Sequence, residues 1–118
     1  MAGEAHYIEI VTPTVEQTCA MHERAHGVSF APPDGGLGGA RVARLPGGAR
    51  LGVRAPMHDA EQPVTRCYLR VDDIEQAASV AAEAGATVAL PPTALPGDHG
   101  RIAIVILGGV EHGLWAVP

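Results

Sequence analysis

The sequence contains an internal repeat with an offset of about 60 residues. An alternating apolar segment at 7–11 is followed by Val15-Glu16-Gln17, and a matching segment at 68–71 is followed by Ile74-Glu75-Gln76. The two halves also end alike, because each has a Gly-Gly turn before a short apolar segment, at 47–48 and at 108–109. A repeat of this length predicts two related modules packed against each other.

Each half predicts the order strand, helix, strand, strand, strand. In the first half these are a strand at His6–Val11, a helix from Thr14 to Gly27, and strands at Val28–Ala31, Ala40–Leu45 and Ala49–Arg54. In the second half they are a strand at Thr65–Val71, a helix at about Asp73–Ala84, and strands at Thr87–Leu90, Ile102–Leu107 and about His112–Val117. Thr14 is expected to cap the first helix, with Gln17 completing a capping box, and Gly27 to end it. A polar linker at 57–63 separates the modules, so we expect one domain over 1–118, with modules at about 5–57 and 64–118.

Charge and composition narrow the classes of partner. The net charge of −5 argues against nucleic acid, because phosphate binding needs a basic face. No apolar run approaches the ~20 residues of a membrane span, and Met1–Glu4 lacks the features of a signal peptide. Cys19 and Cys67 lie in apolar periodic segments and are expected to be reduced core residues. We therefore expect a cytoplasmic protein.

Strand alternation predicts a candidate site. One set of side chains is apolar and is expected under the helices: Ile8, Ile10, Leu51, Val53, Leu69, Val71 and Leu114. The alternate set is polar and aromatic: Tyr7, Glu9, Arg50, Gly52, Arg54, Arg66, Tyr68, Arg70, Glu111, Gly113 and Trp115. The fold expected is α+β, in which two tandem βαβββ modules form paired curved mixed sheets around a cleft lined by this alternate set.

The chain resembles the vicinal oxygen chelate superfamily, which has the glyoxalase/bleomycin-resistance/extradiol-dioxygenase fold. The resemblance rests on the two-fold repeat, on Val71–Glu75 followed by Ala84-Gly85-Ala86, and on the glycine turn and last strand from Gly109 to Trp115. In detail the chain is most similar to small glyoxalase-like proteins described as hydroxylases. The resemblance also makes a homodimer plausible.

The resemblance implies four positions for the ligands of a divalent metal, one on the first and last strand of each module. In this chain they are Tyr7, Gly52, Arg66 and Gly113; the repeat also permits Tyr7 to align with Tyr68. Glycine has no side chain, neutral tyrosine is a poor donor, and arginine is a permanent cation. We therefore expect no metal and no other cofactor.

Three other motifs suggest a functional site, but each also has a structural interpretation. His22-Glu23-Arg24-Ala25-His26 matches the zinc-protease pattern H-E-x-x-H, but it ends at a helix C-terminus, and the histidines are expected to be structural. The glycine-rich segment 35–39 is expected to be a flexible connection, since no helix follows it directly. Asp98-His99-Gly100 could supply acid–base chemistry from a loop, although a solvated loop is the more economical interpretation.

Three functions remain open from the sequence. The first is metal-independent binding of a planar or anionic small molecule by Arg50, Arg54, Arg66, Tyr7, Tyr68 and Trp115, with or without a proton transfer that uses Glu9 as base and Arg66 as oxyanion stabiliser. The second is a metal-dependent lyase, isomerase or oxygenase with displaced ligands drawn from His6, Glu9, His99, Glu111 and His112. The third is a non-catalytic interaction module in which Glu9 and Glu111 form structural ion pairs with the arginines. The sequence leaves open whether the protein is an enzyme.

Overall fold

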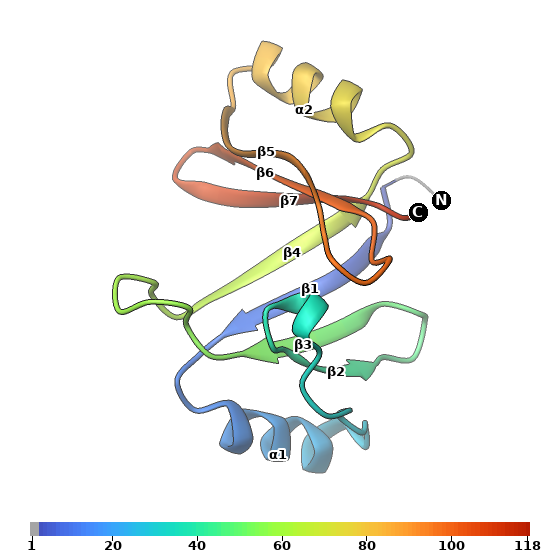
Figure 1. Ribbon diagram of the computed structural model, residues 1–118, viewed down its shortest axis with the longest axis vertical. Helices are drawn as coiled ribbons and strands as arrows, with labels where there is room; N and C mark the ends of the chain where they lie inside the picture. Colours follow the sequence, from blue (N-terminus) through green and yellow to red (C-terminus); the bar gives the residue numbers. More distant parts are fainter. Residues whose placement is uncertain (1–2) are drawn as a thin grey trace. The chain divides into compact units, whose positions relative to one another are not determined.

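The computed structural model describes residues 3–118 and divides them between two units (Figure 1). The N-terminal unit is Tyr7–Thr65, and the C-terminal unit combines the residues up to His6 with Arg66–Pro118. In chain order the elements are β1 (Ala5–Val11), α1 (Val15–His26), the 3-10 turn η1 (Gly35–Leu37), β2 (Arg41–Arg44), β3 (Arg50–Arg54), β4 (Val64–Arg70), α2 (Ile74–Glu83), β5 (Thr87–Ala94), β6 (Arg101–Leu107) and β7 (Val110–Ala116).

In the N-terminal unit β3 lies between β2 and β1. β1 and β3 are parallel, with Glu9 opposite Gly52, whereas β2 and β3 form an antiparallel hairpin. The helix α1 covers one face of these strands, and a core forms between them from Cys19, Phe30, Ala43, Leu51 and Val53, with Ile8 and Ile10 packed against it. The prediction that Ile8, Ile10, Leu51 and Val53 lie under the helix is confirmed in this unit.

Two local predictions for this unit are wrong. The segment 28–31 contributes an isolated bridge between Phe30 and Ala43 rather than a strand. Thr14 is the N-cap residue of α1, but its side chain makes no capping bond. Its hydroxyl instead contacts the hydroxyls of Thr12 and Thr18, at 3.0 and 3.4 Å. Gly27 does end the helix in the left-handed conformation, with φ of 69°.

In the C-terminal unit the strands follow the order β4-β7-β6-β5. β4 and β7 are parallel, and β6 pairs antiparallel with both β7 and β5. Asp73 caps α2 by accepting a bond from the Gln76 amide at 3.1 Å. β5 is longer than expected because it continues through Pro91-Pro92, with shifts in register. Proline is tolerated there because β5 is at the edge of this unit's strands and lacks a second neighbour to bond.

In the C-terminal unit the helix covers only part of the strand face that was expected to lie under it. α2 packs on β5, β6 and β7, while β4 lies on the far side of β7. Leu69 of β4 is therefore 42% exposed, and the prediction that it lies under the helix is wrong. Cys67 is exposed for the same reason, so only Cys19 is a buried thiol; both cysteines are free.

The glycine-rich segment 35–39 forms a defined turn. Asp34 accepts a bond from the Gly36 amide at 2.9 Å, and Leu37 is buried, 8% exposed. Among residues 3–118, neither helix is long and apolar enough to cross a membrane.

Candidate functional site

The candidate site residues lie on one face of β1 and β3 in the N-terminal unit and on one face of β4 and β7 in the C-terminal unit. Glu9 is opposite Gly52, and Tyr68 is opposite Gly113. Since the two glycines are equivalent in the repeat, Glu9 corresponds to Tyr68, and Tyr7, two residues earlier, corresponds to Arg66. The register thus favours the alignment of Tyr7 with Arg66 over that of Tyr7 with Tyr68.

A tyrosine ring covers the glycine in each unit. A Cβ atom built on Gly52 would overlap the ring and hydroxyl of Tyr7. A Cβ atom on Gly113 would overlap the ring of Tyr68, with Cγ at 2.6 Å. Both tyrosines are buried, 2% and 3% exposed. Neither glycine position can therefore take a larger side chain unless its tyrosine moves.

These positions do not fit the metal that the fold family implies. Tyr7 offers a phenol and Arg66 a guanidinium, while Gly52 and Gly113 have no side chain. The tyrosine rings fill the space beside both glycines. Within residues 3–118 no three His, Cys, Asp or Glu side chains come together as a metal-binding group. The donor chemistry at these four positions thus lacks the imidazoles and carboxylates that divalent ions require.

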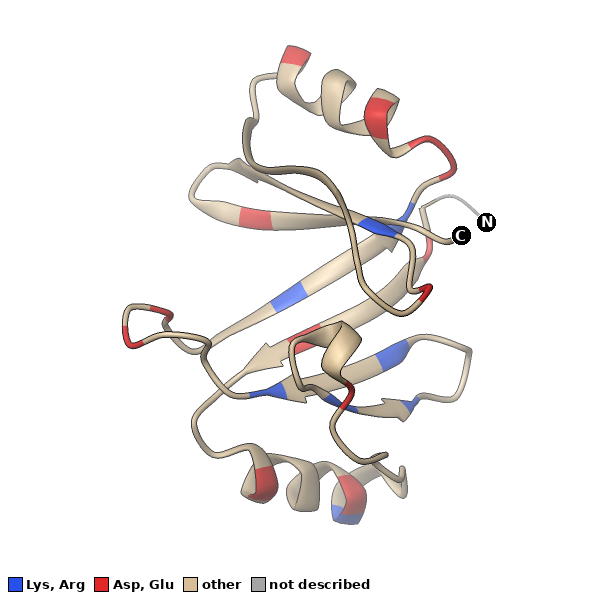
Figure 2. Cartoon of the chain, in the orientation of Figure 1, with Lys and Arg blue, Asp and Glu red and all other residues tan. Residues whose placement is uncertain are grey.

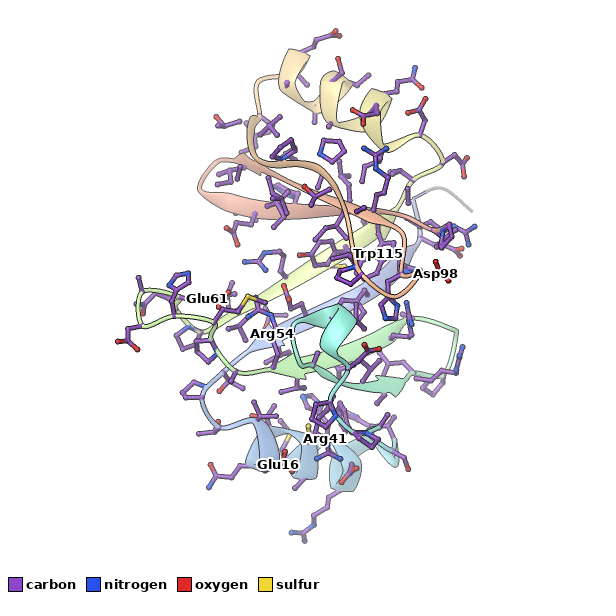
Figure 3. The ribbon with its side chains drawn as sticks, in the orientation of Figure 1. Glu16, Arg41, Arg54, Glu61, Asp98 and Trp115 are labelled. Atoms are coloured by element: carbon purple, nitrogen blue, oxygen red, sulfur yellow. The ribbon has the colours of Figure 1, made fainter. Side chains whose placement is uncertain are left out.

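Arg54 is the centre of an ion network in the N-terminal unit. Its Nε donates to Glu9 at 2.8 Å, and its Nη1 and Nη2 donate to the two oxygens of Glu61 at 3.0 and 2.7 Å (Figure 3). Glu61 also accepts a bond from the Met57 amide at 2.7 Å. These bonds raise the pKa of Arg54, and the Arg54 guanidinium lowers the pKa of Glu61 to about 2.

The network engages two of the predicted ligand-binding residues, Glu9 and Arg54. Glu61 was not expected from the sequence, because it lies in the segment interpreted as a linker. The available signal was an acidic residue seven positions after Arg54, close enough for a loop to return it to the strand end. Arg50 lies over the Tyr7 ring, with its guanidinium carbon 6.0 Å from the ring centroid.

In the C-terminal unit Arg66 pairs with Glu111. Its Nε and Nη2 donate to the same carboxylate oxygen at 2.9 and 2.7 Å. The Arg66 side chain is 10% exposed, whereas the Glu111 side chain is 37% exposed. Glu111 is therefore the more solvent-accessible member of the pair.

Arg70 has a different environment on the same face of β4. It is directly opposite Trp115 of β7. Its Nε is buried and has no hydrogen-bond acceptor among residues 3–118. Buried N–H groups nearly always have an acceptor. Strand parity identified the face of Arg70, but only the structure shows the missing acceptor.

Trp115 anchors an aromatic cluster in the C-terminal unit. Its ring meets Tyr68 edge-on at 5.5 Å, and His6 lies 5.0 Å away. Its Nε1 donates to the backbone carbonyl of His99 at 2.8 Å, which ties the loop containing Asp98 to β7 (Figure 3). Trp115 is 2% exposed, so the cluster forms a wall beside the arginines rather than an open stacking surface.

The other histidines proposed as displaced ligands are not gathered into one group. His6 contacts Trp115, His99 bonds through its carbonyl, and His112 is exposed on the opposite parity of β7. On α1, His22 and His26 stack with their centroids 5.4 Å apart, and Glu23 accepts a bond from the Phe30 amide. Glu23 is thus engaged in holding the chain after the helix, as a structural interpretation of H-E-x-x-H expects.

The charges are distributed unevenly between the elements (Figure 2). All eight basic residues are arginines, and they lie on strands except for Arg24. Acidic residues are concentrated on the helices and loops. The strands therefore carry positive charge in a chain whose net charge is −5.

Comparison with known proteins identifies the fold. No family model and no curated protein matches the sequence. Methylmalonyl-CoA epimerase from Mycobacterium tuberculosis superposes with a TM-score of 0.76 at 16% identity, over 99% of this chain and 89% of that one. A methylmalonyl-CoA epimerase in complex with methylmalonyl-CoA and NH4+ superposes with a TM-score of 0.75 at 16% identity, over 99% of this chain and 96% of that one. A hypothetical protein from Bacillus halodurans superposes with a TM-score of 0.77 at 14% identity, over 100% of this chain and 96% of that one. The chain has the α+β glyoxalase/bleomycin-resistance fold, as the sequence predicted.

Proposed function

We propose that this protein binds an anionic small molecule without a metal, and that Arg70 is the residue that holds the anion. The observation that carries the proposal is the buried Nε of Arg70, which has no acceptor among residues 3–118. A guanidinium donates strong, charge-assisted hydrogen bonds to carboxylates and phosphates. A ligand anion would supply the acceptor that the described protein atoms do not.

The surroundings of Arg70 favour an organic anion. Trp115 lies opposite Arg70, and Tyr68 lies two residues away on the same face of β4. Arg66 is four residues from Arg70, roughly 13 Å along an extended strand, and is compensated by an exposed carboxylate. A ligand with a second acidic group would reach Arg66 by displacing Glu111. Arg54, by contrast, is compensated within the protein by Glu9 and Glu61.

Two solved structures of this fold contain acidic CoA compounds: methylmalonyl-CoA in one epimerase and 2-nitronate-propionyl-CoA in another. They are consistent with binding of an organic anion by this chain, but at 16% identity they do not identify the compound. Proton transfer by Glu9, Arg66 or His99, a hydroxylase activity, a homodimer and a cytoplasmic location all stay predictions from the sequence.

A matched pair of probes tests the proposal. Benzoate and benzamide have nearly the same shape, but only benzoate carries a charge at neutral pH. We expect benzoate to raise the melting temperature of the protein and to shift the Arg70 Nε–H resonance, because a ligand that binds the folded state stabilises it. Benzamide should have little effect on either observable.

The variant Arg70→Met should lose the benzoate effect. The control is Arg101→Met, since Arg101 is an exposed arginine of the same unit, paired with Glu75 at 2.5 Å, and this variant should keep it. Equal responses to benzoate and benzamide, or equal losses in both variants, would refute the assignment of Arg70. Stoichiometric zinc, manganese, nickel or iron(II) in the purified protein, measured by mass spectrometry, would refute metal independence.

A further inference from the structure

An open cavity of about 800 Å³ adjoins the C-terminal end of α1 in the N-terminal unit. Its walls include Ile8 and Ile10 of β1 and Leu51 of β3, and α1 contributes His22 and His26. Ile8 and Ile10 have the opposite parity to Tyr7 and Glu9, so the cavity lies on the helix-covered face and is separate from the arginine-lined face. The cavity is mostly apolar, and its polar lining residues are the two histidines and Thr65.

His22, which lines this cavity, has an unsatisfied polar atom. Its Nδ1 is buried and has no hydrogen-bond partner among residues 3–118. The ring is held in place by neighbours on both sides: it stacks on His26 at 5.4 Å and lies 6.5 Å from the Phe30 ring. An apolar cavity with one or two polar groups is the usual form of a small-molecule site. A buried nitrogen without a partner calls for a ligand atom that can bond to it.

The chemistry of the cavity selects the kind of ligand. We propose that it binds a compact apolar molecule bearing one hydroxyl group, such as an aliphatic alcohol or a phenol, with His22 Nδ1 as the polar contact. Nδ1 of a neutral imidazole is a donor in one tautomer and an acceptor in the other, and a hydroxyl satisfies either. The apolar body of the ligand would lie against Ile8, Ile10 and Leu51.

A carboxylate suits the cavity less well. His26 is the last residue of α1, so the histidines lie at the negative end of the helix dipole. Glu23 lies on the same turn and adds a negative charge. A neutral hydroxyl avoids this repulsion. The cavity therefore differs in ligand charge, as well as in location, from the site around Arg70.

Methyl and imidazole NMR spectra of the whole chain provide the test, with p-cresol as the probe and toluene as its apolar counterpart. We expect p-cresol to shift the His22 ring resonances together with the methyl resonances of Ile8, Ile10 and Leu51. Toluene should shift the same methyl groups but bind roughly 3- to 10-fold more weakly, which is the ratio expected for one net hydrogen bond.

Two variants separate the hydrogen bond from the cavity. His22→Phe should keep toluene binding and lose the preference for p-cresol, whereas the control His58→Ala, at an exposed histidine outside the cavity, should keep the preference. If His22→Phe does not give a native spectrum, the wild-type comparison decides alone. Equal affinities for p-cresol and toluene in the wild type, or shifts confined to residues outside the cavity, would overturn the proposal. So would zinc bound stoichiometrically at His22 and His26, because the nitrogen would then be a metal ligand.

Discussion

The Tyr7 side chain lies against Gly52, in the space that a Cβ atom would occupy at any other residue type. The glycine is needed for room and not for its backbone conformation, because its φ is outside the positive range. In the second module a tyrosine ring, that of Tyr68, also lies against a glycine, Gly113, but from the position directly opposite it on the neighbouring strand. A tyrosine ring therefore fills the space beside each of the two glycines at which the resemblance places metal ligands, although the two tyrosines occupy different register positions.

Gly52→Ala should destabilise the protein by about 1–3 kcal/mol, because the added methyl group must displace a buried ring. The free energy of unfolding from chemical denaturation measures the effect. Gly35→Ala is the matched control, since a Cβ at Gly35 would meet nothing within 4 Å and its φ is ordinary; it should change stability by less than about 0.5 kcal/mol. Equal effects of the two substitutions would show that Tyr7 does not fill the space beside Gly52.

The Arg54–Glu61 pair predicts a specific acid sensitivity. Arg54 lowers the pKa of Glu61 from the ordinary value of 4.5 to about 2. A depressed pKa in the folded state gives stability that is present above pH 4.5 and is lost as the pH falls towards 2. Glu61→Gln should therefore cost roughly 1.5–3 kcal/mol at neutral pH, as expected for a hydrogen bond to a charged group.

The difference in unfolding free energy between wild type and Glu61→Gln should shrink as the pH falls from 4.5 towards 2. Glu16→Gln is the control, since Glu16 pairs with Arg41 through a carboxylate that is 77% exposed. Such a surface pair contributes at most about 1 kcal/mol. A constant difference for Glu61→Gln across this pH range would contradict the assigned pKa shift.

The two helix N-termini should respond differently to substitution. Asp73→Ala should destabilise the protein by about 1 kcal/mol, because the Asp73 carboxylate caps the Gln76 amide. Thr14→Ala should cost less, because the Thr14 side chain makes no capping bond. Asp73→Asn should restore most of the loss, since asparagine is an equally good cap. Unfolding free energies of the three variants measure the contrast, and equal losses for Asp73→Ala and Thr14→Ala would contradict it.

The sequence was sufficient to predict the order of elements because both modules carry the same pattern of alternation and turns. It also predicted which side chains share a face, since parity along a strand is fixed by backbone geometry. Parity says nothing about what covers a face. Leu69 and Leu51 have the same pattern, but α1 covers β3 while α2 leaves β4 exposed.

The limits at the candidate site have a similar cause. Arg54, Arg66 and Arg70 look equivalent in the sequence, because each alternates with apolar residues on a strand. Their surroundings differ in three dimensions: Arg54 pairs with two carboxylates, Arg66 pairs with the more exposed Glu111, and the buried Nε of Arg70 has no hydrogen-bond acceptor within residues 3–118. The loop that returns Glu61 to Arg54 depends on tertiary contacts that no local pattern encodes.

The two thiols should react at very different rates. Cys67 is exposed, whereas Cys19 is 1% exposed and burial raises its pKa, which leaves less of the reactive thiolate. An aromatic disulfide reagent should label one thiol quickly in the native protein and the second only on unfolding. Cys67→Ser should abolish the fast phase, and Cys19→Ser should leave it unchanged. A fast phase that survives in Cys67→Ser would contradict the burial of Cys19.

Arg70→Met should separate stability from binding. The buried Nε of Arg70 lacks an acceptor among residues 3–118, so its removal takes away a desolvation cost that is typically about 1–3 kcal/mol for such a group. Methionine preserves most of the apolar stem of the side chain. We therefore expect unfolding free energy to be unchanged or higher in this variant, while the response to benzoate is lost. A structural arginine would give the opposite result, in which stability falls and any benzoate response persists. Chemical denaturation and benzoate titration of the same samples distinguish the two outcomes, because a residue retained for ligand binding is expected to lower the stability of the unliganded protein.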